Sequence, residues 1–564
     1  MNPRNPGPGM RILGASLLML ALAAVSAVAA PPSNDELVRY ADAALAANYP
    51  ADGPGAAALV VRDGEVLLRK GYGLAELELG VPIQPDMVFE IGSVTKQFTA
   101  AAILMLEERG LLSVEDEVTK HLPDYPTHGA KITIDHLLTH VSGIPSYTGL
   151  PEWIPRVRED ITLEQLIGLF KDKPLEFQPG ERWAYNNSAY ILLGAVIEKV
   201  SGKTYEEFVE GEIFAPLGMK RSRYGSQSEV IPGRAEGYGR DENGFRRAAY
   251  LSMTQPYSAG ALFSTVDDLW RWEQGLASGR LLRPRTLERM FTPIKLNSGA
   301  NAHYAYGWNT FEYGDRKVIE HGGDIFGFSS HVVRVPEEKL YVAILSNNPG
   351  AERSPEDLGL GIAAKAIGAA FEERPALALD PKVLDEYVAV YRFDAATTRA
   401  ITHENGKLYS QRNGGAKAEI AASAKDELFF RDSAARLRFR RDATGKVIGL
   451  DFLASMGVDG YGVRTDEPLP SERQAVKVDS ALFDVYAGSY ELAPGFNLVV
   501  TREGDQLFVQ PTGQSKAELF AQSELEFFLK VADVRITFER PADGKASGLV
   551  LHQAGRDVPA KRVE

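Results

Sequence analysis

The chain has 564 residues, of which 44% are hydrophobic and 24% are charged, a balance that suits a folded protein with several hydrophobic cores. Its formal net charge of -14 argues against nucleic acid or an anionic membrane as a partner. The absence of cysteine excludes disulfides, thiolate chemistry and lipid attachment at a cysteine.

Residues 1–30 have the pattern of a secretory signal peptide. Arg4 and Arg11 precede an apolar run from Ile12 to Ala30, and Ala27-Val28-Ala29 supplies small residues for cleavage. A transmembrane anchor is the alternative, because the run is near the minimum length that spans a bilayer. We predict a periplasmic or secreted protein with no stable membrane anchor after cleavage.

Residues 31–373 are predicted to form one α+β domain. Residues 31–50 have a helical pattern, and Ala57–Arg62 with Glu65–Arg69 predict a β-hairpin around Asp63-Gly64. The pattern is then mostly helical to about residue 290. Strands return at Lys317–Glu320, Ser329–Val335 and Tyr341–Leu345. Strands at both ends of a helical middle favour one antiparallel sheet with a helical subdomain.

The segment Phe89–Leu106 predicts a buried helix with a polar first turn. Its apolar side chains recur at helical spacing, at Phe98, Ala101, Ala102, Met105 and Leu106. Ser93 and Lys96 are three residues apart and share a face, so the amine can assist removal of the hydroxyl proton. A Ser-x-x-Lys pattern arises about once by chance in a chain of this length, so it gains meaning only from its companions.

Two later motifs supply such companions. Trp183-Ala184-Tyr185-Asn186-Asn187 follows a turn and precedes an apolar helix. A Tyr185 hydroxyl near an ammonium is favoured in its ionised form and becomes a usable base, and Asn187 can orient both the lysine and a substrate carbonyl. The alternative is a half-buried tyrosine beside a turn asparagine.

His321-Gly322-Gly323 is predicted to end the strand that starts at Lys317. Two glycines permit close approach of a ligand, and the exposed strand edge can pair with an extended substrate while the N–H of Asp324 faces the reacting carbonyl. A plain Gly-Gly turn is the alternative. The order of the motifs brings nucleophile, base and edge strand into one domain.

The remainder of the chain is repetitive. After a predicted linker at Ala369–Pro381, residues 387–450 match residues 486–549 at 21 of 64 positions without a gap. Each copy alternates apolar and polar residues in short runs between turns. We therefore predict two small antiparallel β-barrels, at residues 380–470 and 476–564, because closure hides the sheet edges.

These motifs together resemble the serine hydrolases related to class C β-lactamases and D,D-peptidases. The resemblance covers about residues 35–370 and rests on Phe89–Lys96, His136–Ile144, Pro179–Asn187, Ser258–Leu262 and His321-Gly322-Gly323. It implies a β-lactamase/transpeptidase-like domain followed by the two barrels. It also implies that Ser93 is the acylated nucleophile, Lys96 and Tyr185 the acid/base pair, and Asn187 a substrate-amide contact.

The resemblance further implies an oxyanion hole made by the N–H groups of Ser93 and Asp324, and substrate binding along His321, Gly322 and Gly323. Relatives that hydrolyse β-lactams or D-Ala-D-Ala carry lysine where this chain has His321. A histidine is mostly neutral at pH 7 and holds a carboxylate poorly. His-x-Gly is similar to the aminopeptidase and esterase branches, and the two barrels resemble the three-domain D-aminopeptidases.

The sequence thus predicts an acyl-enzyme serine hydrolase acting on a small-molecule or short-peptide substrate, with an aminopeptidase for D-amino-acid amides or short peptides as the first choice. An esterase, a weak β-lactamase or D,D-carboxypeptidase, and a non-catalytic cell-wall or β-lactam sensor remain alternatives. We expect no cofactor and no metal, because His136 and His140 lack the glutamate of a His-Glu-x-x-His motif. A homo-oligomer is left open.

Overall fold

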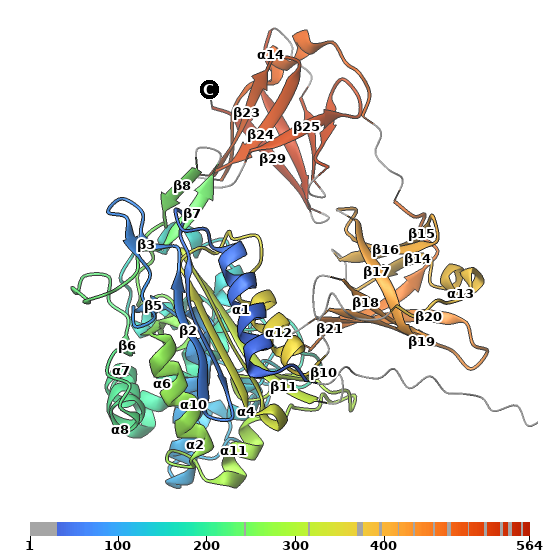
Figure 1. Cartoon of the computed structure of the whole chain (residues 1–564). Coiled ribbons are helices and arrows are strands. Elements are labelled where there is room, and N and C mark those ends of the chain that lie inside the picture. The colour runs from blue at the N-terminus through green and yellow to red at the C-terminus, as the bar shows by residue number, and fades with distance from the viewer. Residues whose placement is uncertain are drawn as a thin grey trace, which may run out of the picture.

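The computed structural model contains three bodies, which are an N-terminal part from α1 to α12 and two β-barrels (Figure 1). It describes residues 31–563 except 242–243, 314–315, 369–375, 394–396, 416, 432–434, 455–456, 471–474, 494–495, 513–515, 531–533, 540–543 and 554–555. The predicted signal peptide and residues 369–375 of the predicted linker lie outside this range. Within it, no helix is long and apolar enough to cross a membrane.

A six-stranded antiparallel sheet forms the centre of the N-terminal part, in the order β10-β11-β12-β13-β1-β2. Its strands are β1 (Ala56–Arg62), β2 (Glu65–Tyr72), β10 (Asn309–Tyr313), β11 (Arg316–Ile325), β12 (Phe328–Val335) and β13 (Leu340–Ser346). Strand β1 pairs with β13, Ala56 lying opposite Ser346. The sheet is therefore closed by segments from both ends of this part, as the sequence predicts.

The predicted hairpin and the two later strands are confirmed, but β11 is longer than expected. It includes His321-Gly322-Gly323 and ends at Ile325, because pairing with β12 continues through both glycines. Its pairing with β10 stops at Glu320. From His321 to Ile325, β11 therefore pairs with β12 on one edge and, among the described residues, with no strand on the other edge.

Helices cover both faces of the sheet. On one face lie α1 (Asn34–Asn48) and α12 (Pro355–Ala366), whose apolar side chains share a core with β1 and β13. The other face carries α10 (Val266–Ala277) and a larger core that extends into the helical region. The expected helix at residues 31–50 is confirmed, with Leu37, Ala41 and Leu45 buried.

The helical region contains the segment Phe89–Leu106, which the sequence predicts to carry the nucleophile. Helix α2 spans Thr95–Glu108 and is buried from Thr95 to Leu106, since it is enclosed by α6 (Asn187–Ser201) and α9 (Tyr257–Gly260). Ser93 lies in a 3-10 turn, Gly92–Val94, immediately before α2. The other helices of this part are α3 (Val118–His121), α4 (Ile134–Leu138), α5 (Leu163–Gly168), α7 (Tyr205–Val209), α8 (Ala215–Leu217) and α11 (Pro284–Met290).

Short strands connect these layers. Strands β5 (Phe89–Glu90), β9 (Leu262–Ser264) and β6 (Arg223–Tyr224) form a three-stranded sheet in the order β5-β9-β6. Strand β5 leads directly into the 3-10 turn of Ser93. The remaining pairs are β3 (Leu74–Glu76) with β4 (Val81–Pro82), and β7 (Tyr238–Asp241) with β8 (Gly244–Arg247).

The two predicted barrels are confirmed as closed eight-stranded antiparallel barrels. The first consists of β14 (Ala389–Arg392), β15 (Thr398–Glu404), β16 (Lys407–Arg412), β17 (Lys417–Ala424), β18 (Glu427–Phe430), β19 (Arg436–Arg441), β20 (Val447–Ala454) and β21 (Gly457–Thr465). The second consists of β22 (Gly488–Ala493), β23 (Phe496–Glu503), β24 (Gln506–Pro511), β25 (Ala517–Ala521), β26 (Glu526–Phe528), β27 (Val534–Phe538), β28 (Gly548–Gln553) and β29 (Arg556–Arg562). Short helices α13 (Pro381–Glu386) and α14 (Phe483–Tyr486) precede them.

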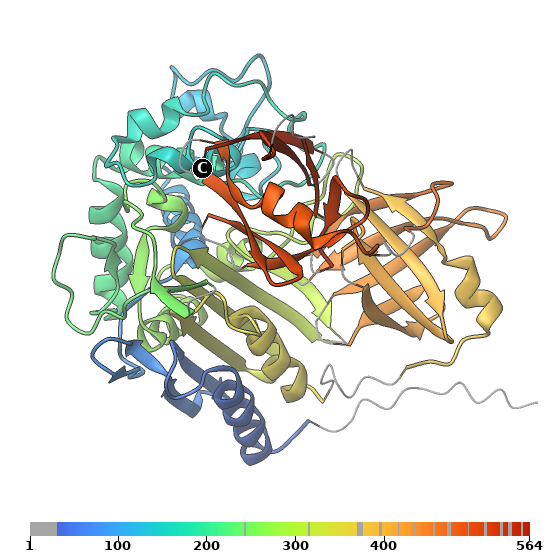
Figure 2. The ribbon, with the colours of Figure 1, turned by 90° about the horizontal axis from the view of Figure 1, so that it is seen from above.

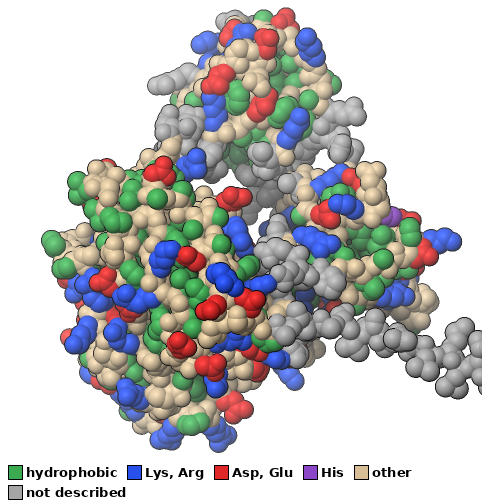
Figure 3. All heavy atoms as spheres, viewed as in Figure 1, with side chains coloured by type: hydrophobic (Ala, Val, Ile, Leu, Met, Phe, Trp, Pro, Cys, Tyr) green, Lys and Arg blue, Asp and Glu red, His purple; other side chains and the backbone are tan. Residues whose placement is uncertain are grey.

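The barrels share details of their cores. Tyr387 stacks on Phe439 at 4.4 Å between ring centroids, and Tyr486 stacks on Phe538 at 4.3 Å. The first barrel lies beside the β10 edge of the sheet, where Arg436 donates to the carbonyl oxygen of Glu312 at 3.0 Å (Figures 1 and 2). Acidic and basic side chains are interspersed over the visible face of the N-terminal part, and the barrels form separate lobes (Figure 3).

Candidate active site

Lys96 lies next to Ser93 and is fully buried. Its Nζ is 3.0 Å from Ser93 Oγ, 2.9 Å from Asn187 Oδ1 and 2.8 Å from the carbonyl oxygen of Ala259. These three acceptors match the three donors of an ammonium group. Burial nevertheless lowers the pKa of Lys96 well below its ordinary value of 10.5, because the charged form is desolvated. The amine can therefore lose a proton and accept one from Ser93.

Tyr185 lies against the same amine. Lys96 Nζ is 4.8 Å from the centre of the Tyr185 ring. Burial raises the pKa of Tyr185, and its hydrogen bond with Ser93 only partly opposes this. The ionised form expected from the sequence is therefore not favoured, because burial disfavours the charged phenolate and the pKa is raised further by Asp324 and Glu320. Tyr185 is held as a protonated hydroxyl beside Ser93.

Asn187 is placed by the start of α6. Asn186 caps this helix, its side chain accepting from the N–H of Ala189 at 2.9 Å. The Asn187 backbone N–H donates to Ser146 Oγ at 3.1 Å, and its Nδ2 donates to Thr148 Oγ1 at 3.1 Å. The amide oxygen is thereby turned toward Lys96, which fixes both groups beside Ser93.

His321 is in the site but is buried and neutral. Only 2% of its surface is exposed, and burial lowers its pKa to about 3, with Lys96 adding to the shift. Its Nδ1 lies 2.6 Å from the Gly322 carbonyl oxygen, so Nδ1 carries the proton, and Nε2 accepts from the Tyr304 hydroxyl at 2.9 Å. This ring therefore supplies no positive charge for a substrate carboxylate.

The two glycines of β11 are not equivalent. A Cβ added to Gly323 would lie 2.2 Å from the Ile91 carbonyl oxygen and 2.8 Å from Ser93 N, whereas one added to Gly322 would make only ordinary contacts. Ser330 Oγ donates to Ile91 O at 2.8 Å and joins the segment before Ser93 to the sheet. Only Gly323 is therefore required for β11 to approach the Ser93 turn.

The backbone next to Gly323 lies close to the same turn. Gly92 has a φ of 49°, and a Cβ there would lie 3.1 Å from Asp324 N. The N–H groups of Ser93 and Asp324 thus belong to two segments in close contact. Paired N–H groups at such a junction can stabilise the negative charge that develops on a carbonyl oxygen under attack.

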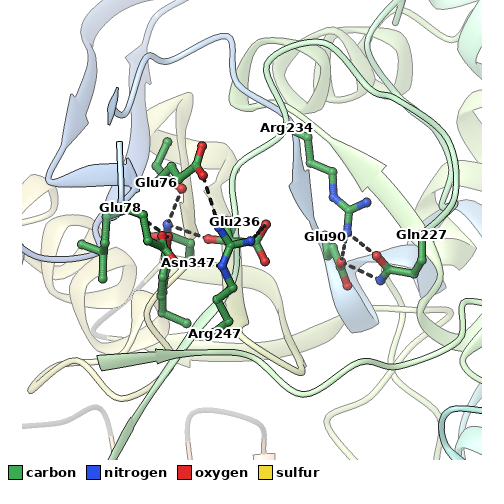
Figure 4. Close-up of polar contacts among 11 residues, drawn as sticks. Glu76, Glu78, Glu90, Gln227, Arg234, Glu236, Arg247 and Asn347 are labelled. Carbon is green, nitrogen blue, oxygen red and sulfur yellow. Dashed lines mark hydrogen bonds and ion pairs between the residues drawn. The ribbon is translucent and has the colours of Figure 1, made fainter. Parts of the chain in front are cut away.

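A partly buried ion pair between Arg234 and Glu90 holds the strand that leads to Ser93 (Figure 4). Glu90 is 4% exposed, and its Oε1 accepts from Arg234 Nη2 at 2.9 Å and from Gln227 Nε2 at 3.1 Å. Burial raises the pKa of Glu90 to about 7. Beside this pair, Asn347 Nδ2 donates to the carbonyl oxygens of Leu74 and Glu236. The first set of contacts fixes β5, and those of Asn347 join the segments at Leu74 and Glu236.

A small cavity of about 100 Å³ opens beside Ser93 and Asn187. Its walls are largely apolar and aromatic, and they include Tyr147, Trp153, Leu251, Pro256, Ile325 and Phe326. Among the described residues that line it, none is lysine or arginine, and Asp324 is the one ionisable acid. The cavity therefore suits a compact apolar group next to the reacting carbonyl.

The structure brings together every site residue that the sequence predicts, and it adds Tyr304, which lies outside the motifs, and His140, which lies in a motif but was given no role in the reaction. His140 is fully buried, and its ring lies 4.5 Å from both Tyr185 and Tyr304. Burial lowers the pKa of His140 well below 6.5. Tyr185 and Tyr304 are far apart in sequence. Only the position of His140 in the His136–Ile144 motif could therefore have indicated that its ring packs between them.

His136 and His140 have separate tasks. His136 Nδ1 accepts from the Thr133 N–H at 3.3 Å as part of the cap of α4, while His140 Nδ1 accepts from the Asn186 N–H at 3.1 Å. Within the described ranges, no group of three or more histidine, aspartate or glutamate side chains could hold a metal ion.

Comparison with known families agrees with this geometry. A family model described as "Beta-lactamase" matches residues 43–367, which is more than half of the chain. The chain belongs to the beta-lactamase family. The serine hydrolases of this family are its relatives, and the domain described above is its beta-lactamase domain. A second model, "Domain of unknown function (DUF3471)", matches residues 472–562, which contain the second barrel.

This beta-lactamase family protein is similar to relatives that carry different names. It is 31% identical over 420 residues to "Penicillin-binding protein 4*" of Bacillus subtilis (strain 168), a match that covers 68% of this chain and 89% of the relative. It is 30% identical over 339 residues to the "D-aminopeptidase" of Gluconobacter oxydans (strain 621H), covering 58% of this chain and 61% of that relative.

Among solved structures, the family member resembles the octameric penicillin-binding protein homologue from Pyrococcus abyssi. The TM-score is 0.53 at 26% identity, and the match covers 77% of this chain and all of the other.

Proposed function

We propose that this protein is a secreted serine hydrolase that works through an acyl-enzyme. The observation that carries the proposal is the contact of 3.0 Å between Lys96 Nζ and Ser93 Oγ at a buried amine whose pKa is lowered. A neutral amine at hydrogen-bonding distance from a hydroxyl is a general base for a nucleophile.

The proposed reaction begins when Ser93 Oγ gives its proton to Lys96 and bonds to the substrate carbonyl carbon. The N–H groups of Ser93 and Asp324 stabilise the resulting oxyanion. The carbonyl then re-forms, the bond to the leaving group breaks, and the leaving group takes a proton from the Tyr185/Lys96 pair. Water attacks the ester, and Ser93 regains its proton as the acid product leaves.

Tyr185 acts in this scheme as a proton donor. Burial keeps its hydroxyl protonated, so it can pass a proton to a departing amine and be restored from Lys96. The role of base at the start of the cycle belongs to Lys96. His140 and Tyr304 position Tyr185 and His321 through ring contacts and the hydrogen bond to His321 Nε2.

The first choice of substrate is the amide of a D-amino acid or a short peptide, cleaved after its N-terminal residue. The neutral His321 and a cavity without lysine or arginine do not favour a substrate carboxylate at this position. The apolar walls suit the side chain of the acylated residue. The relative named D-aminopeptidase supports this choice.

A penicillin-binding or weak β-lactamase activity is the second candidate, and the relative named Penicillin-binding protein 4* favours it. Rates on D-alanine p-nitroanilide, nitrocefin and p-nitrophenyl butyrate separate aminopeptidase, β-lactamase and esterase. We expect the anilide to give the highest kcat/KM. Stable acylation of Ser93 without turnover of any of the three would instead indicate a binding protein.

Ser93→Ala tests the hydrolase itself. We expect the variant to lose turnover of the preferred substrate and labelling by a serine-reactive fluorophosphonate while its thermal unfolding is unchanged. Ser228→Ala, at an exposed loop position, is the matched control and should keep both properties. Turnover in purified Ser93→Ala at the rate of the control would overturn the proposal.

The proposal also states that the protein is exported and where its domains begin and end. We propose that residues 1–30 are a signal peptide, that residues 31–373 form the hydrolase domain, and that residues 380–470 and 476–564 are two copies of one duplicated barrel module. The similar Tyr-Phe stacking in both barrels supports the duplication. A periplasmic or secreted location follows, and the sequence of the mature N-terminus tests it.

A further inference from the structure

A second, larger cavity lies between the first barrel and the β10 edge of the sheet. Its volume is about 870 Å³. Residues from both bodies line it, among them His303, Glu312 and Lys317 from the N-terminal part and Arg436, Arg438 and Arg440 from β19. The Arg436 hydrogen bond to the Glu312 carbonyl joins its two walls.

The three arginines form a row on the outside of the barrel. They alternate along β19 with Leu437 and Phe439, which point into the barrel core and are 0% and 4% exposed. Alternate residues of a strand are about 6.6 Å apart on one face. The row therefore places three arginine Cα atoms at regular intervals along one side of the cavity.

Positive charge exceeds negative charge in this cavity. The described residues that line it include Lys317 and the three arginines but only two acids, Glu312 and Asp451, although the whole chain is acidic. Arg440 forms a two-point ion pair with Asp451. Arg438 pairs with Glu427 through Nε alone, and its side chain is 52% exposed. These pairs hold the guanidinium groups of Arg438 and Arg440 in place.

The second barrel provides an internal comparison. At positions 99 residues later it keeps Arg535 and the core residue Phe538, but it has Thr537 and Glu539 where the first barrel has Arg438 and Arg440. The barrel architecture is thus compatible with other residues at these two positions. The complete row of arginines is therefore a feature of the barrel that lines the cavity, where Arg438 and Arg440 are paired with Glu427 and Asp451.

The cavity also adjoins a residue pair of the active site. His303 lines the cavity, and the next residue, Tyr304, donates to His321 Nε2 at 2.9 Å. The His303 carbonyl accepts from the Thr310 N–H at 2.8 Å, which holds this segment against β10. Occupation of the cavity would therefore touch a segment that contacts the site.

We propose that this cavity binds a compact ligand with two or more oxyanion groups, phosphate or carboxylate, spaced to meet neighbouring guanidinium groups. Arginine recognises both groups through paired N–H donors. The regular spacing favours a multivalent ligand over a single anion, and the volume leaves room for one. This site is separate from the proposed hydrolase reaction and does not depend on it.

Isothermal titration calorimetry of the full-length protein in 50 mM salt tests the proposal. The probes are tripolyphosphate, tricarballylate and, as the monovalent comparison, inorganic phosphate. We expect at least one multivalent probe to bind about tenfold more tightly than phosphate, and the stronger one names the preferred oxyanion. Binding should weaken as salt is raised.

Three variants locate the binding. Arg438→Thr introduces the residue of the second barrel, Lys317→Gln alters the opposite wall, and Arg412→Thr removes an exposed arginine of the same barrel outside the cavity. We expect the first two to weaken binding about fivefold and the third to leave it unchanged. The proposal would be overturned if neither tripolyphosphate nor tricarballylate bound. It would also be overturned if all three variants weakened binding equally.

Discussion

Replacing Lys96 by methionine is the sharpest test of the proposed chemistry. Methionine has nearly the length of lysine and fits an apolar enclosure, but it removes the amine that contacts Ser93, Asn187 and Ala259. The fold should keep its packing, since Lys96 is already fully buried within α2. The substitution thus separates loss of the base from loss of structure.

The expected effects on rate and stability differ in size. Loss of a general base lowers the rate by about 10²- to 10⁴-fold, or roughly 3 to 5 kcal/mol in the activation barrier. Each of the three acceptors loses a donor at a cost of about 1 kcal/mol. The variant no longer has to desolvate an amine, which offsets part of that cost. The free energy of unfolding should therefore change much less than the barrier.

The assay compares kcat/KM and urea unfolding for wild type, Lys96→Met and Lys199→Met, the last being an exposed lysine of α6. In the wild type, the rate should rise with pH as Lys96 loses its proton, and this limb should lie well below pH 10.5 because burial lowers the pKa of Lys96. Lys96→Met should lack the limb. A rate within tenfold of wild type in that variant would refute the assignment.

Three further predictions follow from the site. Tyr185→Phe should reduce hydrolysis of an anilide by orders of magnitude but of p-nitrophenyl butyrate far less, because a good leaving group needs no proton; equal losses in the two assays would contradict a donor role. Gly323→Ala should abolish activity and lower the melting temperature, since its Cβ would overlap the Ser93 turn, whereas Gly322→Ala should be tolerated in the same assays. Folding raises the pKa of Glu90 from 4.5 to about 7, so between these pH values the native state keeps a proton that the unfolded chain loses. The free energy of unfolding should therefore fall by on the order of 3 kcal/mol as the pH rises from 4.5 to 7. Urea unfolding of Glu90→Gln should not show this fall.

Much of the fold could be predicted because its signals are local. The alternation in the barrels, the hairpin at Asp63-Gly64 and the apolar spacing of α2 each depend on neighbouring residues. The length of β11 could not be predicted in this way. Glycine weakens a strand locally, and only the pairing with β12 carries β11 through Gly322 and Gly323 to Ile325.

The site was predictable as a set of motifs, but its electrostatics were not. The proximity of Tyr185 to Lys96 suggested a tyrosinate, whereas enclosure by His140 and neighbouring rings desolvates the hydroxyl and raises its pKa. Enclosure depends on segments far apart in sequence. The same reason explains why Tyr304, a residue outside the recognised motifs, was not foreseen as the partner of His321.

His303 and Tyr304 are consecutive but contact different parts of the molecule. His303 lines the cavity beside the first barrel. Tyr304 contacts the buried ring of His321, which follows the last residue of β11 that pairs with β10. Trimming the chain after α12 to obtain a minimal enzyme would consequently bare the outer side of this dipeptide to water. We therefore expect the kinetics of a shortened protein to differ from those of the intact molecule, because Tyr304 contacts His321.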